Sequence, residues 1–363
     1  MPQTSANNTQ QRLKTFAQTI ANWQKAAGRH HLPWQESNSP YTIWLSEIML
    51  QQTQVATVIP YYQRFLARFP TLKSLATADV DEILPYWAGL GYYQRAHNLH
   101  KCAQIIYFEH AATFPKTAQE LEQLPGIGRT TAAAIAAFAY GERAAIMDGN
   151  VQRVLARYLG IRESPHKQAG KRLFWDYAEQ ALKAAPNSLD MTAYTQGQMD
   201  LGATLCRRSS PNCQPCPLQA SCYAFAHQVQ DQLPTRRARK TPPKRHCFML
   251  VAQNAQNEFL LEKQDDVGIW AGLWALPQFE QLDDLYQYCR QQGFSSTTKA
   301  KRLTRVNHAF SHFSLAIEPW YVTGAPLTVK ENDARLQWFC AKNLQDAALP
   351  APIRQILTPL MNV

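Results

Sequence analysis

The chain has 363 residues and a formal net charge of +10 at pH 7, and it is long enough for two domains with sizeable cores. A basic balance favours a polyanionic partner, although a generally basic soluble enzyme has the same balance. The N-terminus is polar, and no apolar run approaches the ~20 residues that cross a bilayer. These features argue against a secretory signal or a membrane span and predict a cytoplasmic protein with no membrane partner.

The N-terminal part of the chain has apolar residues at helical spacing, punctuated by prolines, and predicts a helical domain over residues 1–232. On one predicted helix, Glu47 shares an apolar face with Ile43 and Trp44. A glutamate on such a face is unusual, and desolvation there raises the pKa of a carboxyl group, which keeps a proton available near neutral pH. The alternative is a surface glutamate whose carboxylate extends into water.

Residues 112–140 contain the string LPGIGRTTAAAIA, in which a proline and two glycines form a tight turn before an alanine-rich helix. Gly126 and Gly128 allow backbone amides to approach a phosphate at a helix N-terminus, whose dipole favours anions. The turn therefore resembles the hairpin of a helix-hairpin-helix DNA-binding motif.

Asp148 begins the string DGNVQRVLAR. By itself it is as consistent with an N-cap of the helix that starts near Val151 as with a catalytic role. Together with Glu47, however, it forms the pair expected for cleavage of an N-glycosidic bond. One protonated acid assists the leaving base, and one carboxylate faces the cationic sugar.

Residues 206–222 read CRRSSPNCQPCPLQASC, a C-x6-C-x2-C-x5-C pattern formed by Cys206, Cys213, Cys216 and Cys222. Four thiolates in one short loop can surround a metal centre. Two local disulfides are disfavoured because the chain has no export signal, and structural zinc sites usually consist of two separated pairs. The run instead resembles the iron–sulfur loop of the endonuclease-III-type DNA glycosylases. Its Arg207 and Arg208 are candidates for phosphate contacts.

Residues 233–245 are basic and proline-rich, and they predict an exposed linker that either only connects two domains or also contacts a DNA backbone. In residues 246–363, short runs rich in branched and aromatic side chains predict strands, and one amphipathic helix is expected at about 281–292. The sequence therefore predicts a second, α+β domain.

Six motifs occur in the order expected for the MutY family, the adenine DNA glycosylases: SEIMLQQTQV, GLGYYQRAHNL, LPGIGRTTAAAI, MDGNVQRVLAR, MDLGATLC and the cysteine loop. The chain resembles this family over most of its first 225 residues. The resemblance implies an all-α helix-hairpin-helix domain with a 4Fe–4S cluster on the four cysteines, followed by an α+β Nudix-like domain. It also implies a bacterial, nucleoid-associated monomer that acts on double-stranded DNA carrying adenine opposite 8-oxoguanine or guanine.

The resemblance further implies the catalytic roles. Glu47 would donate a proton to N7 of a flipped-out adenine and would later activate the incoming water. Asp148 would stabilise the oxocarbenium-like sugar, either directly or through a transient covalent adduct. Asn150 would orient Asp148 by hydrogen bonding.

Contacts with the DNA are implied in the same way. The adenine pocket would be lined by Leu32, Trp34 and Gln35. Gln52 and Tyr92 would enter the base stack, because extruding a base costs roughly a few kcal/mol of unstacking that replacement contacts must offset. Core packing is the alternative for Trp34 and Tyr92.

Thr130 distinguishes two reaction types. The related bifunctional endonucleases carry a lysine at this hairpin position, and its amine forms a Schiff base with the sugar that leads to strand cleavage. Threonine forms no such intermediate, and no lysine lies between Lys116 and Lys167. The sequence therefore predicts a monofunctional glycosylase that leaves an abasic site.

The second domain resembles the Nudix hydrolases, whose G-x5-E-x7-R-E-x2-E-E-x-G pattern holds magnesium. From Gly272 that register falls on Gln278, Tyr286, Gln287, Arg290, Gln291 and Gly293. Every expected glutamate is missing, and magnesium binds through carboxylates, so we expect no pyrophosphohydrolase activity.

The string HAFSHF, residues 308–313, looks like the loop with which the MutY family inspects the base opposite adenine. Phe310 would insert near that base, Ser311 would hydrogen-bond the N7–H of 8-oxoguanine, and His312 would support the loop or contact DNA. The alternative is a strand in which Phe310 belongs to the core and His312 is solvated.

Two other functional classes fit parts of the sequence. An endonuclease-III-like lyase acting on oxidised pyrimidines is disfavoured by Thr130 and by the whole second domain. A non-catalytic DNA-damage binder is disfavoured by Glu47 and Asp148, because a pure binder needs neither carboxylate.

Overall fold

The structure is a computed structural model and divides into two compact units. It describes residues 3–236, 241–294, 300–325 and 335–361. The first unit comprises residues 1–73 and 101–239, and the second comprises residues 74–100 and 240–363. The second unit therefore includes a segment from the middle of the predicted helical domain, which we did not expect from the sequence.

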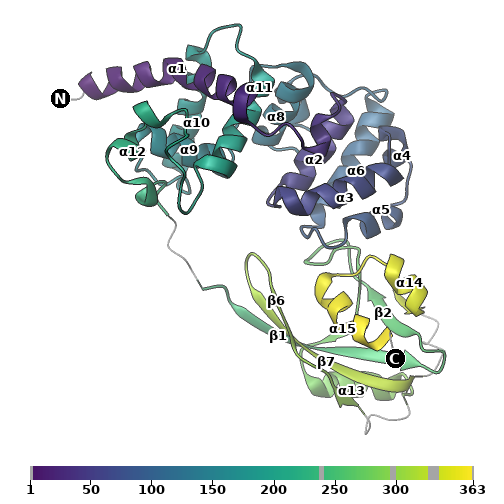
Figure 1. Cartoon of the computed structure of the whole chain (residues 1–363). Coiled ribbons are helices and arrows are strands. Elements are labelled where there is room, and N and C mark those ends of the chain that lie inside the picture. Colours follow the sequence, from purple (N-terminus) through teal and green to yellow (C-terminus); the bar gives the residue numbers. More distant parts are fainter. Residues whose placement is uncertain (1–2, 237–240, 295–299, 326–334, 362–363) are drawn as a thin grey trace. The chain divides into compact units, whose positions relative to one another are not determined.

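The first unit is helical, as predicted (Figure 1). Its helices are α1 (Gln3–Ala27), α2 (Pro40–Leu50), α3 (Val55–Arg68), α7 (Ala118–Leu121), α8 (Arg129–Tyr140), α9 (Gly149–Leu159), α10 (Gln168–Ala184), α11 (Met191–Asp200) and α12 (Tyr223–Ala226). Single turns are η1 (Pro33–Gln35), η2 (Ile105–Glu109), η3 (Leu201–Leu205), η4 (Gln219–Ser221) and η5 (Gln230–Gln232). The helices α4 (Leu72–Ala76) and α6 (Gln94–Gln104) each begin in one unit and end in the other.

The alanine-rich helix α8 is central to the first unit. Its residues 132–137 are all buried, and α8 contacts α2, α7 and α11. Small side chains allow these helices to approach closely. The helix α1 packs along α11, where the ring of Phe16 lies 5.0 Å from that of Tyr158 and 6.5 Å from that of Tyr194. The helix α11 in turn contacts both α8 and α9, the helices whose first residues the candidate site uses.

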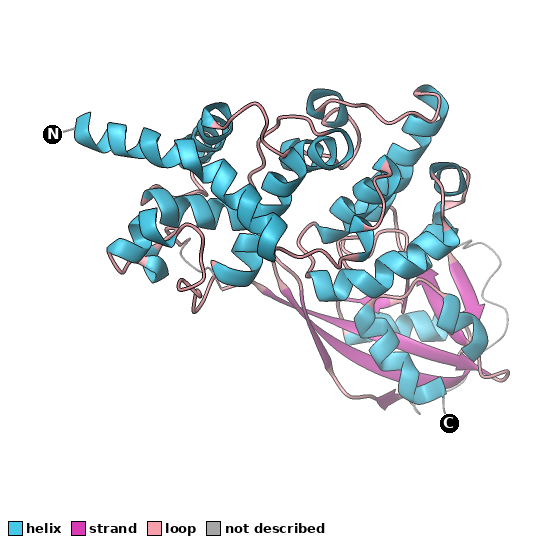
Figure 2. Ribbon diagram, turned by 45° about the horizontal axis from the view of Figure 1, so that its top comes forward, coloured by secondary structure: helices cyan, strands magenta, loops and turns pink. Residues whose placement is uncertain are grey.

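The second unit combines helices with one mixed sheet, which confirms the predicted α+β class (Figure 2). Its helices are α5 (Val80–Trp87), α13 (Leu282–Gln291), α14 (Ala341–Asp346) and α15 (Ala351–Met361). Its strands are β1 (Lys244–Asn254), β2 (Phe259–Lys263), β3 (Trp274–Ala275), β4 (Gln278–Phe279), β5 (Lys301–Arg302), β6 (Val306–Ala309), β7 (Ser314–Ala325) and β8 (Leu336–Phe339).

The long strands β1 and β7 form the centre of this sheet. They run parallel in a register that begins with Lys244 opposite Ser314, whereas the other strand pairs are antiparallel. The main path through the sheet is β3-β2-β1-β7-β5. Helix α13 packs on β1 and β4 and lies where the sequence predicted a helix. The buried apolar run of β1 explains why this strand occupies the centre.

Contacts with the loop before β3 explain why residues 74–100 belong to the second unit. His97 Nε2 lies 3.1 Å from the carbonyl oxygen of Ala271, and Lys263 forms an ion pair with Asp81. Gly272 has a left-handed φ of +70°, and a Cβ there would lie only 2.9 Å from Leu84 Cδ1. Glycine is thus needed at position 272 both for the backbone conformation and for the close approach of Leu84.

Among the helices that the structure describes, none is long and apolar enough to cross a membrane.

Candidate active site

A cleft of about 790 Å³ in the first unit brings together most of the predicted catalytic residues. They come from separate elements, namely the loop before α2, α2 itself, the first turn of α8 and the first turn of α9. The predicted site residues that line the cleft are Leu32, Trp34, Glu47, Gln52, Thr130, Asp148 and Asn150. Gln35 lines a neighbouring pocket, together with Trp34 and Glu47.

Glu47 lies in α2 among buried neighbours and is itself half-buried. Burial, followed by the negative charge of Asp148, raises the pKa of Glu47 to about 8. Desolvation penalises the charged form of a carboxyl group, and a nearby like charge does the same. Glu47 therefore holds its proton at neutral pH and is suited to act as an acid.

Asp148 lies in the opposite kind of environment, because it caps the N-terminus of α9. Its Oδ1 accepts hydrogen bonds from the backbone N–H groups of Asn150 (2.9 Å) and Val151 (2.8 Å). Its Oδ2 accepts a bond of 3.0 Å from the side-chain Nδ2 of Asn150. Three N–H donors and a helix N-terminus match an ionised carboxylate. The N-cap alternative from the sequence is thus confirmed, and the same residue also faces the cleft.

Arg153 holds Asn150 in place, a role that the sequence did not predict. Its Nη2 donates to Asn150 Oδ1 (2.7 Å) and to the carbonyl oxygen of Gly202 (2.8 Å), and its Nε donates to the carbonyl oxygen of Cys206 (2.7 Å). A residue that bridges positions about 50 apart in the chain has no local sequence signal. The Asp148–Asn150 pair is therefore fixed from behind by the segment that leads into the cysteine loop.

The loop that carries Leu32 and Trp34 is anchored by Asp200, a fully buried residue at the end of α11. The two carboxylate oxygens accept from the backbone N–H of Arg29 (2.8 Å) and from its Nε (2.7 Å). Gln35 closes the loop, since its Oε1 accepts from Leu32 N–H (3.0 Å) and its Nε2 donates to the carbonyl oxygen of Arg29 (3.0 Å). Gln35 therefore shapes the loop through its amide group, and Asp200 was missed because it lies far away in the sequence.

Thr130 uses its hydroxyl group within the protein. Its Oγ1 accepts a hydrogen bond of 3.2 Å from the backbone N–H of Met147, the residue before Asp148. A lysine at position 130 would lack this hydroxyl group. The hydrogen bond between the start of α8 and the backbone beside Asp148 would then be lost. In the hairpin before α8, Gly126 has a left-handed φ of 78° and Gly128 is the N-cap. No protein atom lies within 4 Å of a Cβ built on Gly128, so its backbone is open to a ligand.

The two predicted intercalating residues share an unusual backbone. Gln52, in the first unit, has φ 57°, and Tyr92, in the second, has φ 51°. Positive φ is uncommon outside glycine and marks sites where the surrounding structure enforces a strained conformation. Gln52 is exposed, and Tyr92 is 44% exposed, an unusual value for a large aromatic side chain. Core packing, the alternative for Tyr92, is therefore wrong, whereas Trp34 is buried in edge-to-face contact with Tyr62.

The four loop cysteines are neighbours in space. All eight cysteines are free thiols, so the loop contains no disulfides. Burial and the nearby thiols of Cys206, Cys222 and Cys213 raise the pKa of Cys216 to about 12. Within the described residues, no three His, Cys, Asp or Glu side chains form a site that could hold a metal ion. The buried Arg157 donates from Nη1 to Cys206 Sγ (3.3 Å).

In the second unit, residues 310–313 form the turn between β6 and β7. The backbone N–H of Phe310 donates to the carbonyl oxygen of Phe313 (2.8 Å), and their rings stack at 4.6 Å. Ser311 and His312 are exposed, with Ser311 Oγ 3.4 Å from His312 Nδ1. The strand ends at Ala309 and Phe310 is half-buried, so the alternative of a strand with Phe310 in the core is wrong, whereas its solvated His312 is confirmed. The turn therefore presents two polar side chains to solvent beside a pair of stacked rings.

Comparison with known proteins agrees with this geometry. Residues 45–180 match the family model of the HhH-GPD superfamily base excision DNA repair protein, and residues 248–359 match the NUDIX domain. A thermostable thymine-DNA glycosylase superposes with a TM-score of 0.53 at 26% identity, covering 60% of this chain and 98% of that one. A non-covalent endonuclease III–DNA complex shares the fold, with a TM-score of 0.51 at 21% identity over 61% of this chain and 98% of that one. The fold and the cleft thus define a DNA N-glycosylase of base excision repair.

Relatives narrow the class further. An adenine DNA glycosylase of Buchnera aphidicola subsp. Baizongia pistaciae is 36% identical over 349 residues, which cover 95% of this chain and 96% of that protein. The adenine DNA glycosylase of Homo sapiens is 30% identical over 409 residues, which cover 95% of this chain and 73% of that protein. The chain belongs to the adenine DNA glycosylase family, which confirms the resemblance and the two-part fold class inferred from the sequence.

Proposed function

We propose that this protein hydrolyses the N-glycosidic bond of adenine that lies opposite 8-oxoguanine or guanine in duplex DNA, and that it leaves an abasic site. One observation carries the proposal. Two carboxyl groups face the same cleft in opposite environments, because Glu47 is desolvated and Asp148 accepts three N–H hydrogen bonds. Pairs of carboxyl groups held in opposite protonation states are typical of glycosidic bond cleavage.

In the proposed reaction, the Glu47 carboxyl group donates its proton to N7 of adenine while the bond between C1′ and N9 breaks. The electron pair of that bond leaves with the base, and the cationic sugar faces the Asp148 carboxylate. Water then adds to C1′, and its proton returns to Glu47. Asn150 and Arg153 act as positioning residues for Asp148, because they fix the direction of its carboxylate.

We propose a monofunctional reaction, because Thr130 has no amine and its hydroxyl is bonded to the backbone beside Asp148. The adenine pocket consists of Leu32, Trp34 and Gln35. The hairpin glycines Gly126 and Gly128 would contact a phosphate at the N-terminus of α8. Around the extruded base, Gln52 and Tyr92 would fill the stack, and their strained, exposed backbones suit insertion.

For the opposing base, we propose recognition by the turn at residues 310–313. The rings of Phe310 and Phe313 stack on each other in this turn, and Ser311 is exposed. A hydroxyl acceptor is suited to the N7–H of 8-oxoguanine, a group that guanine lacks. His312, also exposed, would support Ser311 or contact the DNA backbone.

Cys206, Cys213, Cys216 and Cys222 would hold a 4Fe–4S cluster. The proposal is supported by the electrostatic interaction among these partly buried thiols and by the guanidinium of Arg157 at one sulfur, whereas the four side chains would still have to converge on the cluster. When bound, the cluster would supply a fixed structural centre for the loop, with no open position for substrate. An absorption band near ~400 nm that disappears on replacing Cys213 by serine is the expected signature.

The remaining assignments complete the proposal. Residues 1–232 would form the catalytic domain, residues 233–245 the linker and residues 246–363 the recognition domain. The protein would act as a monomer in the bacterial cytoplasm, associated with the nucleoid. The formal charge of +10 suits a partner whose backbone is a polyanion.

The test is single-turnover cleavage of duplexes with one adenine opposite 8-oxoguanine, guanine or thymine, resolved with and without alkali. We expect release of adenine from the first two duplexes, and strand breaks at that position only after alkali treatment. Strand breaks without alkali would show a lyase, and binding without any release of adenine would show a pure damage binder. Either result would refute the proposed reaction.

A further inference from the structure

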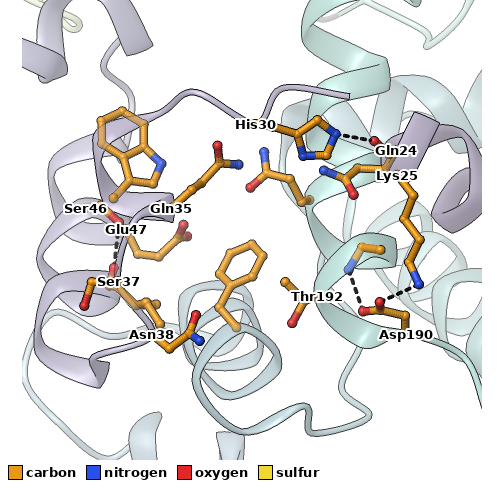
Figure 3. A pocket seen from close by; sticks show the side chains of 15 residues that line it. Gln24, Lys25, His30, Gln35, Ser37, Asn38, Ser46, Glu47, Asp190 and Thr192 are labelled. Carbon is orange, nitrogen blue, oxygen red and sulfur yellow. Dashed lines mark hydrogen bonds and ion pairs between the residues drawn. The ribbon is translucent and has the colours of Figure 1, made fainter. Parts of the chain in front are cut away.

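A second, smaller pocket of about 290 Å³ adjoins the catalytic cleft. Both spaces are lined by Trp34, Glu47 and Gln196, so these three side chains form the boundary between them. Figure 3 shows the Glu47 carboxyl group turned toward the interior of this pocket, beside Gln35. We call it the rear pocket. Glu47 is therefore accessible from two sides, the cleft and the rear pocket.

Most of the residues that line the rear pocket have polar side chains, and Trp34, Ile43, Phe138 and Ala193 add apolar surface of about the same extent. The walls come from the end of α1, the loop before α2 and the start of α11, where Lys25 pairs with Asp190 at 2.7 Å and His30 Nε2 lies 2.9 Å from the carbonyl oxygen of Gln24 (Figure 3). Thr192 and Asn38 lie at exposed positions of the lining. A polar space of this size holds on the order of ten waters, whereas apolar cavities stay dry. The rear pocket is thus suited to a chain of waters that ends at Glu47.

The proposed reaction consumes one water, and the cleft offers it no obvious path. Gln52, the start of α8 and the start of α9 border the cleft, so a duplex docked on them in the proposed reaction would cover it. In the proposed reaction the extruded adenine would lie on the cleft side, against Leu32, Trp34 and Glu47. The nucleophile must therefore arrive from a side that DNA does not close.

We propose that the rear pocket is the entry route for the hydrolytic water, which passes the boundary formed by Trp34, Glu47 and Gln196 to C1′ of the sugar. The inference rests on the proposed adenine excision. The bond that forms is C1′–O, the water gives one proton to Glu47, and adenine leaves with the proton that Glu47 had donated. A route through a narrow pocket admits small nucleophiles more easily than large ones. A small neutral alcohol that competes with water therefore tests whether the nucleophile passes through the rear pocket.

The experiment is single-turnover excision in aqueous methanol, followed by mass spectrometry of the DNA strand. Methanol capture leaves a methyl glycoside and water capture leaves an abasic sugar, so their ratio reports which nucleophile arrived. We expect Thr192→Phe and Asn38→Phe, which narrow the rear pocket, to lower this ratio at least about threefold, because narrowing raises the barrier more for the larger nucleophile. The ratio is internal to each sample, and therefore a partly unfolded preparation does not change it.

Two controls isolate the rear pocket. Thr113 is an exposed threonine outside the pocket whose Oγ1 donates to the carbonyl oxygen of Ala111 (3.4 Å), as Thr192 Oγ1 donates to that of Ala137 (3.3 Å). Thr113→Phe repeats the same change elsewhere, and Thr192→Val removes the hydroxyl without adding bulk. The route is supported if the ratio of methyl glycoside to abasic sugar falls in Thr192→Phe or Asn38→Phe and stays at the wild-type value in both controls.

An unchanged ratio in both pocket variants, or an equal fall in a control, overturns the inference. The reaction itself is judged separately, since the wild-type protein must release adenine before any ratio exists. A wild-type protein that releases no adenine would refute the proposed function, whereas wild-type ratios in every variant would refute only the entry route.

Discussion

The two units of this chain differ in whether they keep carboxyl groups at the positions where their folds would use them. In the helical unit, Glu47 and Asp148 face one cleft, and each is held in a defined environment. In the Nudix-like unit, helix α13 occupies the place where magnesium ligands are expected, and the register positions Tyr286, Gln287, Arg290 and Gln291 include no carboxylate. A fold can thus keep its architecture while a few side chains decide whether it performs chemistry or recognition.

The units also differ in where their functional groups lie. The surroundings of Glu47 and Asp148 are held by charged side chains, namely the buried Asp200 behind the pocket loop and the half-buried Arg153 behind Asn150. The turn at residues 310–313 instead places Ser311 and His312 in solvent beside the stacked rings of Phe310 and Phe313. Chemistry at a bond requires groups fixed before the substrate arrives, whereas inspection of a base requires groups that can touch it.

The largest expected effect separates catalysis from helix capping. Replacing Glu47 by glutamine or Asp148 by asparagine should each lower the single-turnover rate of adenine release by about 10²- to 10⁴-fold. Asparagine is also a good N-cap residue, so Asp148→Asn should leave the helix intact. The matched control is Asp79→Asn, because Asp79 caps α5 in the same way through Asp81 N–H (3.0 Å) and lines none of the cavities described. Equal losses in Asp79→Asn and Asp148→Asn would show that capping alone is at work.

A second effect concerns stability and pH at Glu47. The folded protein keeps the Glu47 proton up to about pH 8, whereas the unfolded chain releases it near its ordinary value of 4.5. Stability therefore falls as pH rises through this window and stays low above it. Glu47→Gln removes the penalty and should be more stable than the wild type by roughly 2–4 kcal/mol at pH 8.5, with no difference at pH 4. Urea unfolding of both proteins at pH 4 and pH 8.5 measures this difference in the free energy of unfolding. The same difference at both pH values would contradict a buried, protonated Glu47.

The third effect tests how the catalytic pair is held. Arg153→Lys keeps a positive charge but cannot donate to Asn150, Gly202 and Cys206 together. Leaving these partners unsatisfied costs ~1–3 kcal/mol, so we expect adenine release to slow about tenfold while DNA affinity is retained. Affinity is measured on a duplex with an uncleavable adenine analogue. A loss of affinity with an unchanged rate would instead assign Arg153 to DNA binding.

The smallest effect belongs to the recognition unit. Ser311→Ala should lower the preference for 8-oxoguanine over guanine by about fivefold, the value of a single hydrogen bond near 1 kcal/mol. Thr304→Ala changes another exposed hydroxyl of the same unit and should have no effect. If both opposing bases lost rate equally in Ser311→Ala, the turn would serve binding and not discrimination.

The sequence predicted the features that depend on residues close together in the chain. The N-cap at Asp148, the apolar helix face around Glu47 and the left-handed turn at Gly126 all depend on neighbours within a few residues. Strands β1 and β7 and helix α13 likewise followed from hydrophobic patterns. Much of the secondary structure and the two carboxyl groups that share the cleft were therefore accessible to sequence reasoning.

Contacts between residues far apart in the sequence were not accessible to sequence reasoning. Asp200 binds Arg29 across 171 positions, and Arg153 binds Cys206 across 53. The placement of residues 74–100 in the second unit depends on contacts such as that of His97 with Ala271, 174 positions apart. No periodicity or motif encodes such pairs, because they arise only when separate elements pack.

The central claim is that Glu47 delivers a proton that burial allows it to keep at neutral pH. The most direct test is the pH dependence of the single-turnover rate of adenine release opposite 8-oxoguanine, measured from pH 6 to 10 with enzyme in excess. The account predicts a plateau that falls tenfold for each pH unit above an apparent pKa of about 8. A rate that stays constant or rises through pH 9 would contradict it, because an ionised Glu47 would then be as effective as the acid.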